Sequence, residues 1–188
     1  MKYILASGSL RRQELLHRVI EKFDIVIGDF DENKVVYQGN IEEYVKELAL
    51  GKAKSVKLNE PSIIIAGDTI VTLDNKILGK PKNEEEAFNM LKTLSGRTHR
   101  VYSGIVVYNT ENNKLEKEAL YTEVTFSELS DEEIRAYIKT KEPLDKAVLK
   151  MLKPLEEHKI VIEENNSTPY TKEFSAINEL LGIVEDLD

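Results

Sequence analysis

Short apolar runs alternate with amphipathic segments along this chain, and the alternation restricts it to a fold that combines strands with helices. The apolar run at residues 62–66 predicts a buried strand, and residues 2–6 predict another. Apolar side chains at helical spacing predict helices over residues 10–20 and 40–58. Strands and helices therefore follow one another from the first residues onward.

Hairpin signals appear in the second half of the chain. The turn-prone pair Asp74-Asn75 separates two short apolar runs, and a polar turn at residues 109–114 separates two longer predicted strands. Further strands are expected at residues 24–27, 70–73, 76–78, 101–108, 118–125 and 159–163. Further helices are expected at residues 83–94 and 130–138, from residue 144 and from about residue 172. Crossovers and hairpins together predict one α/β domain over residues 1–188, with a mixed, twisted central sheet flanked by helices.

Composition excludes several kinds of site. The chain has no cysteine, so disulfides, thiolate metal sites and cysteine nucleophiles are excluded. Its three histidines, His17, His99 and His158, are scattered and form no H-E-x-x-H motif, which argues against a histidine zinc site. A net charge of −8 makes duplex nucleic acid a poor partner, because such binding depends on neutralising phosphates. A small anionic substrate is still compatible with this charge if basic residues converge locally or a cation joins them.

The protein is expected to be cytoplasmic. Its longest apolar run, around residues 63–66, is far shorter than the ~20 residues that a membrane span needs. The apolar stretch at the amino terminus is also too short for a signal peptide. We therefore expect no membrane association.

The turn Ser7-Gly8-Ser9 joins the first predicted strand to a helix whose first turn carries Arg11 and Arg12. Both arginines lie one turn before apolar residues of the inward face, so they are expected to project along that face. Backbone N–H groups at a helix start and guanidinium groups both bind phosphate. The segment therefore predicts an anion site that includes the two serines and the two arginines. The alternative is a capped helix with two solvated arginines.

Charged residues interrupt two apolar patterns. Lys52 falls four residues after Leu48 and four before Val56, on a stripe that should be buried, so it reaches a polar cleft or snorkels to the surface. Asp68 follows the buried strand at residues 62–66, and α/β sheets bind ligands at the carboxyl ends of strands. A carboxylate there can coordinate a divalent cation or orient a water molecule. The alternative is a turn-forming aspartate.

Other candidates lie in polar loops. Glu32 either joins Asp68 at a cation or belongs to a solvated acidic loop. Lys80 follows the predicted hairpin in a position that also suits an ordinary surface turn. The segment with Arg97 and Thr98 either holds phosphate or only ends a helix. Carboxylates and cations gathered from such loops suit metal-assisted attack on a phosphoanhydride.

Several ordered segments, spread over roughly residues 3–147, resemble the motifs of the Maf family. The first is similar to the family's opening small-Ser-x-Ser-Pro-Arg-Arg-x-Glu-Leu-Leu and reads Ala6-Ser7-Gly8-Ser9-Leu10-Arg11-Arg12-Gln13-Glu14-Leu15-Leu16. The others are Asp31-Glu32, Leu48-Ala49-x-x-Lys52-Ala53, Gly67-Asp68-Thr69, Leu78-Gly79-Lys80-Pro81, Leu94-Ser95-Gly96-Arg97-Thr98-His99 and Glu142-Pro143-Leu144-Asp145-Lys146-Ala147.

This resemblance implies an elongated, two-lobed single domain with a central cleft. It also implies a hydrolase that cleaves nucleoside triphosphates to the monophosphate and pyrophosphate with Mg²⁺, or another divalent cation such as Mn²⁺. Asp68 would activate water for attack at the α-phosphorus, and Glu32 would help it to hold the cation. Lys52, Lys80 and Arg12 would bind the triphosphate and offset charge as pyrophosphate leaves, which gives Lys52 and Lys80 a catalytic role beside Asp68.

The resemblance also bears on nucleotide choice. Arg11 and Thr69 match positions that the family links to it. Arg-Arg with Asp-Thr resembles the branch that acts on dTTP and UTP, rather than the branch that acts on 7-methyl-GTP. A homodimer is expected from the resemblance alone.

The chain departs from the family pattern at two places. Leu10 stands where the family has a proline, which alters the pre-organisation of the first helical turn. After Ala147 the family continues Gly-Ala-Tyr-Gly-Ile-Gln-Gly, whereas this chain has Val148-Leu149-Lys150-Met151-Leu152-Lys153. The glutamine linked to base recognition is thus missing, and the part from about residue 148 diverges. This divergence motivates the alternative function, a nucleotide-binding regulator of septum formation with weak or no catalysis.

Overall fold

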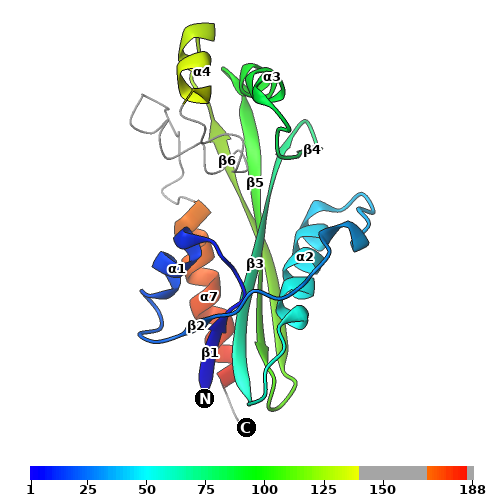
Figure 1. Cartoon of the computed structure of the whole chain (residues 1–188), viewed down its shortest axis with the longest axis vertical. Coiled ribbons are helices and arrows are strands. Elements are labelled where there is room, and N and C mark those ends of the chain that lie inside the picture. The colour runs from blue at the N-terminus through cyan, green and yellow to red at the C-terminus, as the bar shows by residue number, and fades with distance from the viewer. Residues whose placement is uncertain (140–168, 186–188) are drawn as a thin grey trace. The chain divides into compact units, whose positions relative to one another are not determined.

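The structure is a computed structural model that describes residues 1–139 and 169–185 (Figure 1). The chain divides into two compact units. The first contains Met1–Thr69, Tyr102–Leu120 and Ser167–Asp188, and the second contains Ile70–Val101 and Tyr121–Asn166. The single domain with a central cleft that the sequence predicts stays a prediction.

Six strands form one sheet. They are β1 (Lys2–Leu5), β2 (Asp24–Ile25), β3 (Ser62–Leu73), β4 (Lys76–Leu78), β5 (Thr98–Asn109) and β6 (Leu115–Thr125). The strand order is β2-β1-β3-β5-β6, and β4 pairs with β3. Since β1 is parallel to β2 and β3 while β3 and β4 are antiparallel, the sheet is mixed. This confirms the predicted α/β fold class.

Helices flank the sheet, and polar side chains cap the first turns of several of them. The helices are α1 (Leu10–Leu16), α2 (Ile41–Ser55), α3 (Glu84–Leu94), α4 (Asp131–Ile138) and α7 (Pro169–Glu185), with a 3-10 helix η1 (Glu32–Lys34). The side chains of Asn40, Asn83 and Ser130 each accept a hydrogen bond from a backbone N–H three residues on, which stabilises the first turn. None of the described helices is both long and apolar enough to cross a bilayer.

The core of the first unit is divided by the alternation of side chains along β3. Ile63 and Ile65 pack in one cluster with residues of α1 and α7, whereas Ile64 and Ala66 pack in another with residues of α2. Figure 1 shows α1 and α7 on one side of the sheet and α2 on the other. Continuing this alternation places Thr69 on the α1 and α7 side and its neighbour Asp68 on the α2 side.

The core of the second unit lies under α3 and α4. Leu91 and Leu94 of α3 and Ile134 of α4 are fully buried, and they pack with Val71 and Phe126. The turn between β3 and β4 has positive φ angles at Asp74 (51°) and Asn75 (60°), the conformation of a tight two-residue hairpin. The predicted hairpin is therefore confirmed.

One predicted boundary near Asp68 is wrong. The sequence predicts separate strands at residues 62–66 and 70–73, but β3 runs without interruption through Gly67, Asp68 and Thr69. The polar triplet interrupts the apolar pattern without ending the strand, because the ladder between strands joins backbone groups and does not depend on side-chain polarity. Asp68 therefore lies inside a strand.

Helix ends also differ from the prediction. α1 ends at Leu16 because the N–H groups of Arg18 and Val19 bond three residues back, in a tighter turn. α2 ends at Ser55, since Val56 is extended with ψ 125°. The last helix begins at Pro169, three residues before the predicted start, and proline suits a first helical position. The elements predicted from residue 144 and at 159–163 lie outside the described residues.

His99 belongs to the buried part of β5, not to a polar loop. The residue is 2% exposed, and its ring lies edge-on to Phe126 at 4.8 Å and has no hydrogen-bond partner for either nitrogen among the described residues. Burial lowers the pKa of His99 from 6.5 to about 4.

We predict that His99 makes the folded state less stable as the pH falls from 6.5 to 4. Between these pH values His99 is protonated in the unfolded chain and neutral in the folded chain. Acidification therefore favours unfolding by up to roughly 3 kcal/mol. Urea titrations of the wild type and His99→Leu at several pH values measure this. The variant should lose most of the decline, and an identical pH dependence in both proteins would contradict the assignment.

Candidate active site

The candidate site lies beside the end of β1. β1 pairs with β3 as far as Leu5 opposite Ile65, and β4 pairs with β3 from Val71 onward. Asp68 and Thr69 lie on β3 between these two pairings. The carboxyl end of a parallel strand is where α/β sheets bind ligands, so the location is the expected one although Asp68 does not itself end a strand.

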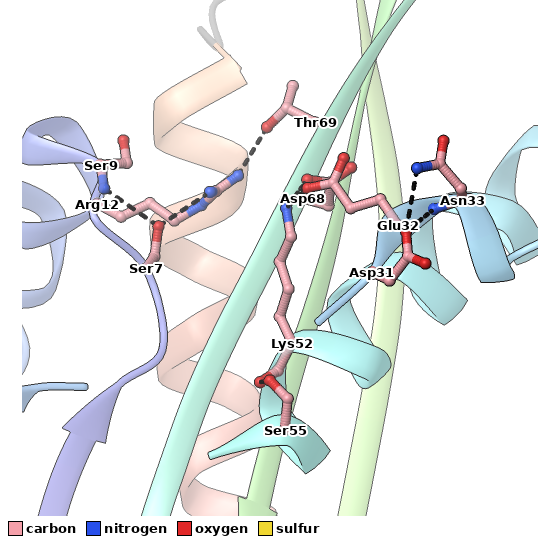
Figure 2. A network of polar contacts seen from close by, with 10 residues as sticks. All are labelled: Ser7, Ser9, Arg12, Asp31, Glu32, Asn33, Lys52, Ser55, Asp68 and Thr69. Carbon is pink, nitrogen blue, oxygen red and sulfur yellow. Dashed lines mark hydrogen bonds and ion pairs between the residues drawn. The ribbon is translucent and has the colours of Figure 1, made fainter. Parts of the chain in front are cut away.

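Lys52 of α2 contacts two carboxylates. Its Nζ forms an ion pair with Oδ1 of Asp68 and lies 2.9 Å from Oε1 of Glu32. The side chains of Lys52 and Asp68 are 23% and 15% exposed, whereas that of Glu32 is 57% exposed. Figure 2 shows the three side chains converging beside β3. Of the two alternatives for Lys52, the structure supports a side chain that reaches a polar site.

The loop that carries Glu32 is anchored on α2. Asp31 caps η1 by accepting a hydrogen bond from the N–H of Asn33 at 3.1 Å, which leaves Glu32 to meet Lys52 (Figure 2). Phe30 packs so closely on α2 that a Cβ at Gly51 would lie 2.0 Å from its ring. The glycine therefore sets the distance at which this loop approaches the helix.

Arg12 of α1 is held on the other face of β3. Its Nε donates to Oε1 of Glu173 at 2.8 Å, Nη2 donates to Oγ1 of Thr69 at 2.7 Å, and Nη1 donates to Oγ of Ser7 at 3.4 Å. The Arg12 and Glu173 side chains are 13% and 5% exposed. The pair is therefore a largely buried ion pair, and it joins α1 to α7.

Two clusters thus flank a single strand. Asp68 and Thr69 are adjacent on β3, so their side chains point to opposite faces. Figure 2 shows Arg12 reaching Thr69 from one side of β3 and Lys52 reaching Asp68 from the other. Four of the predicted charged residues, Asp68, Glu32, Lys52 and Arg12, are thus brought to one stretch of β3, but they divide between its two faces.

The two serines of the turn after β1 are joined by a hydrogen bond. The N–H of Ser9 donates to Oγ of Ser7 at 3.2 Å, and the same oxygen accepts from Arg12. Arg11 is half-buried in the first turn of α1. The predicted strand, turn and helix are therefore present, while the binding of an anion there stays a prediction.

Three predicted site residues belong to the second unit. Lys80 is exposed after β4. Arg97 donates to Oδ2 of Asp74 at 2.6 Å, and the hydroxyls of Thr98 and Thr125 are 2.8 Å apart. The segment with Arg97 does end α3, as one interpretation of the sequence held, and Thr98 begins β5. The phosphate-binding role of these residues stays a prediction.

Glu173 is the site residue that sequence reasoning misses. It carries a charge on the face of α7 that is otherwise buried in the first unit, one turn before Ala176 and Ile177. The same signal, a charged residue on an apolar helical stripe, drew attention to Lys52. Applied to the last helix, it would have found Glu173.

The acidic residues of this region suit a cation whose coordination is completed by oxygens of a bound ligand. Among the residues that the structure describes, no group of three or more His, Cys, Asp or Glu side chains is placed to hold a metal ion. Glu32 and Asp68 are instead two carboxylates brought together by one lysine. Mg²⁺ is commonly bound by one or two carboxylates together with substrate phosphates, so this donor pair fits it.

Fold and site together define an α/β protein whose polar residues gather beside the end of a parallel strand, with carboxylates and cations suited to an anionic ligand. Residues 2–155 match the family model described as Maf-like protein, and the chain belongs to that family.

Two relatives carry the same functional name. A dTTP/UTP pyrophosphatase of Clostridium botulinum (strain Eklund 17B / Type B) is 62% identical over 149 residues, which cover 78% of this chain and 79% of the relative. A dTTP/UTP pyrophosphatase of Clostridium novyi (strain NT) is 48% identical over 189 aligned positions, which cover 100% of this chain and 98% of the relative. A solved HAM1 protein from Coxiella burnetii is similar with a TM-score of 0.45 and 16% identity, over 67% of this chain and 73% of that one.

Proposed function

We propose that this protein is a nucleoside triphosphate pyrophosphatase that hydrolyses dTTP and UTP to the monophosphate and pyrophosphate. Membership of the Maf-like family and the names of its relatives support the reaction and the bases. The observation that carries the proposal is the convergence of Asp68, Lys52 and Glu32 beside β3, since such a site can both take a proton and offset phosphate charge.

In this proposal the chain's own residues perform the proton transfer and bind the charges. A carboxylate oxygen of Asp68 accepts a proton from a water molecule, whose oxygen then forms a bond to the α-phosphorus. The bond from the α-phosphorus to the bridging oxygen breaks, and its electron pair leaves with pyrophosphate. Lys52 orients Asp68 through their ion pair, and its ammonium offsets phosphate charge on that face of β3. Arg12, which lies on the other face, is assigned to the phosphates from its motif.

We propose Mg²⁺ as the cofactor, with Mn²⁺ as a substitute. Asp68 and Glu32 would hold it, together with phosphate oxygens of the substrate. When bound, the cation offsets negative charge on the polyphosphate.

The remaining predicted residues are assigned from their motifs. Ser7, Ser9 and Arg12 would contact phosphates at the turn after β1, and Arg11 and Thr69 would influence the choice of base. The proposed roles of Lys80, Arg97 and Thr98 in binding the triphosphate rest on the sequence motifs alone. We also propose that the enzyme acts on free cytoplasmic nucleotides and forms a homodimer, which sedimentation velocity tests directly.

A panel of nucleoside triphosphates tests the reaction class. The purified chain is incubated with Mg²⁺ and dTTP, UTP, the other common triphosphates and modified bases, and the products are separated and identified. The proposal predicts pyrophosphate and the monophosphate, fastest for dTTP and UTP. Release of orthophosphate would refute the reaction class, and binding without turnover across the whole panel would support the regulator instead.

Gly67 offers a finer test of the Arg12 position. A Cβ at residue 67 would lie 2.8 Å from Nε of Arg12, so Gly67→Ala is expected to push the guanidinium away from Thr69. The KM for dTTP should rise about tenfold, with a smaller change in kcat, because a phosphate contact is lost. Gly182→Ala is the control, since a Cβ there meets nothing within 4 Å. Equal KM values in the two variants would contradict the predicted position.

A further inference from the structure

Glu173 is an acidic side chain in an otherwise apolar environment. Its side chain is 5% exposed, and the next turns of α7 bury Ala176, Ile177 and Leu180. Burying a carboxylate is costly unless a charged partner compensates for it. Its partner is Arg12, at 2.8 Å. α7 lies beyond residues 2–155, the part of the chain that the family model matches.

Each of the three side-chain nitrogens of Arg12 donates a hydrogen bond to a different residue. Nε donates to Glu173, Nη2 donates to Thr69 and Nη1 donates to Ser7. A guanidinium is planar, so an acceptor fixed at Nε sets the direction in which both terminal nitrogens point. Each terminal nitrogen carries a second N–H beyond the one used here. Terminal N–H groups on two nitrogens can bind a phosphate through two bonds.

We propose that Glu173 is a positioning residue for nucleotide binding: it holds Arg12 by Nε so that the terminal nitrogens are presented to the phosphates of the substrate. This inference rests on the proposed function and deepens it. It makes the last helix of the chain a part of the nucleotide site, although α7 does not itself supply a group that contacts the substrate.

The contacts favour positioning over competition with the substrate. A carboxylate that bridged both terminal nitrogens would compete directly with a phosphate for them. Glu173 instead bonds to Nε, and the hydroxyls of Ser7 and Thr69 are the partners of the terminal nitrogens. Neutral hydroxyls are weaker acceptors than phosphate oxygens, so a phosphate can replace them while Glu173 stays in place.

Four variants distinguish the effect of the position of the Glu173 oxygen from the effect of its charge. Glu173→Gln keeps an oxygen that can accept from Nε but removes the charge, whereas Glu173→Asp keeps the charge and shortens the reach. Glu173→Ala removes both, and Glu179→Gln changes an exposed residue of the same helix as the control. For each protein, KM and kcat for dTTP are measured with Mg²⁺, the Kd for inorganic pyrophosphate is measured by calorimetry, and folding is checked by circular dichroism.

Positioning predicts a split between binding and turnover. We expect Glu173→Asp and Glu173→Ala to raise both KM and Kd about tenfold, the equivalent of one lost hydrogen bond to a charged group, with kcat changed less than about threefold. Glu173→Gln should stay within about threefold of the control. If Glu173→Ala does not fold, the comparison of Glu173→Asp with Glu173→Gln decides the matter by itself.

Several results would overturn the proposal. KM and Kd values equal to those of the control in every folded variant would make Glu173 purely structural, and tighter binding in Glu173→Gln would make it a competitor. A wild-type protein that binds pyrophosphate but hydrolyses no nucleotide would remove the proposed function, and the Kd comparison would still decide the role of Glu173. A wild type that binds neither pyrophosphate nor dTTP would overturn both.

Discussion

Asp68→Asn is expected to lower kcat for dTTP hydrolysis by about 10³-fold, while the nucleotide still binds. Asparagine keeps the size of the side chain but cannot take a proton from water, and general-base catalysis typically contributes 10²–10⁴-fold. Lys52 and Arg12 remain to bind the phosphates, so the Kd measured by calorimetry should change far less than kcat. Pyrophosphate release at saturating dTTP gives the rate.

The matched control for this substitution is Asp24→Asn. Asp24 is an exposed carboxylate on β2 that pairs with Lys2, away from the cluster around Lys52. Its variant should retain the wild-type kcat. Turnover by Asp68→Asn at the wild-type rate would remove Asp68 as the base, and an equal loss in both variants would point to unfolding instead.

Arg12→Met is expected to destabilise the fold by about 3–5 kcal/mol. The substitution leaves Glu173, which is 5% exposed, without its charged partner, and an uncompensated buried charge costs about that much. Such a loss is a large part of the total stability of an ordinary domain, about 5–15 kcal/mol. The free energy of unfolding from urea titration is the measurement.

A second pair of variants shows whether the loss comes from the isolated charge. In the double variant Arg12→Met with Glu173→Met, no charge is left in the pair, so most of the stability should return even though both hydrogen-bonding groups are gone. Arg18→Met, which changes an exposed residue just after α1, should alter stability by less than about 0.5 kcal/mol. A double variant that is as unstable as Arg12→Met alone would contradict this account.

The residues around Lys52 could be predicted because local signals specify them. The cap at Asn40 and the apolar stripe through Leu48 predict the helix from sequence alone, and a lysine on such a stripe either reaches a polar site or snorkels to the surface. That Asp68 lies in the interior of β3 could not be predicted in this way. Its neighbours Gly67 and Thr69 interrupt the apolar pattern, whereas the ladder that keeps them in the strand is a tertiary feature.

The role of the last helix depends on long-range packing. Arg12 and Glu173 are separated by 161 positions. The local sequence pattern of either helix does not indicate that these two residues form a pair. Sequence periodicity shows that each charge lies on a buried stripe, but it does not show which stripes meet. The division of the site between the two faces of β3 likewise follows from how α1, α2 and α7 pack on the sheet.

The central claim is that water attacks the α-phosphorus beside Asp68. Hydrolysis of dTTP in water enriched in heavy oxygen tests this most directly, with the label located by mass spectrometry of the separated products. The account predicts one heavy oxygen in the monophosphate and none in pyrophosphate. Label in pyrophosphate, or in released orthophosphate, would place the attack at a different phosphorus and contradict it.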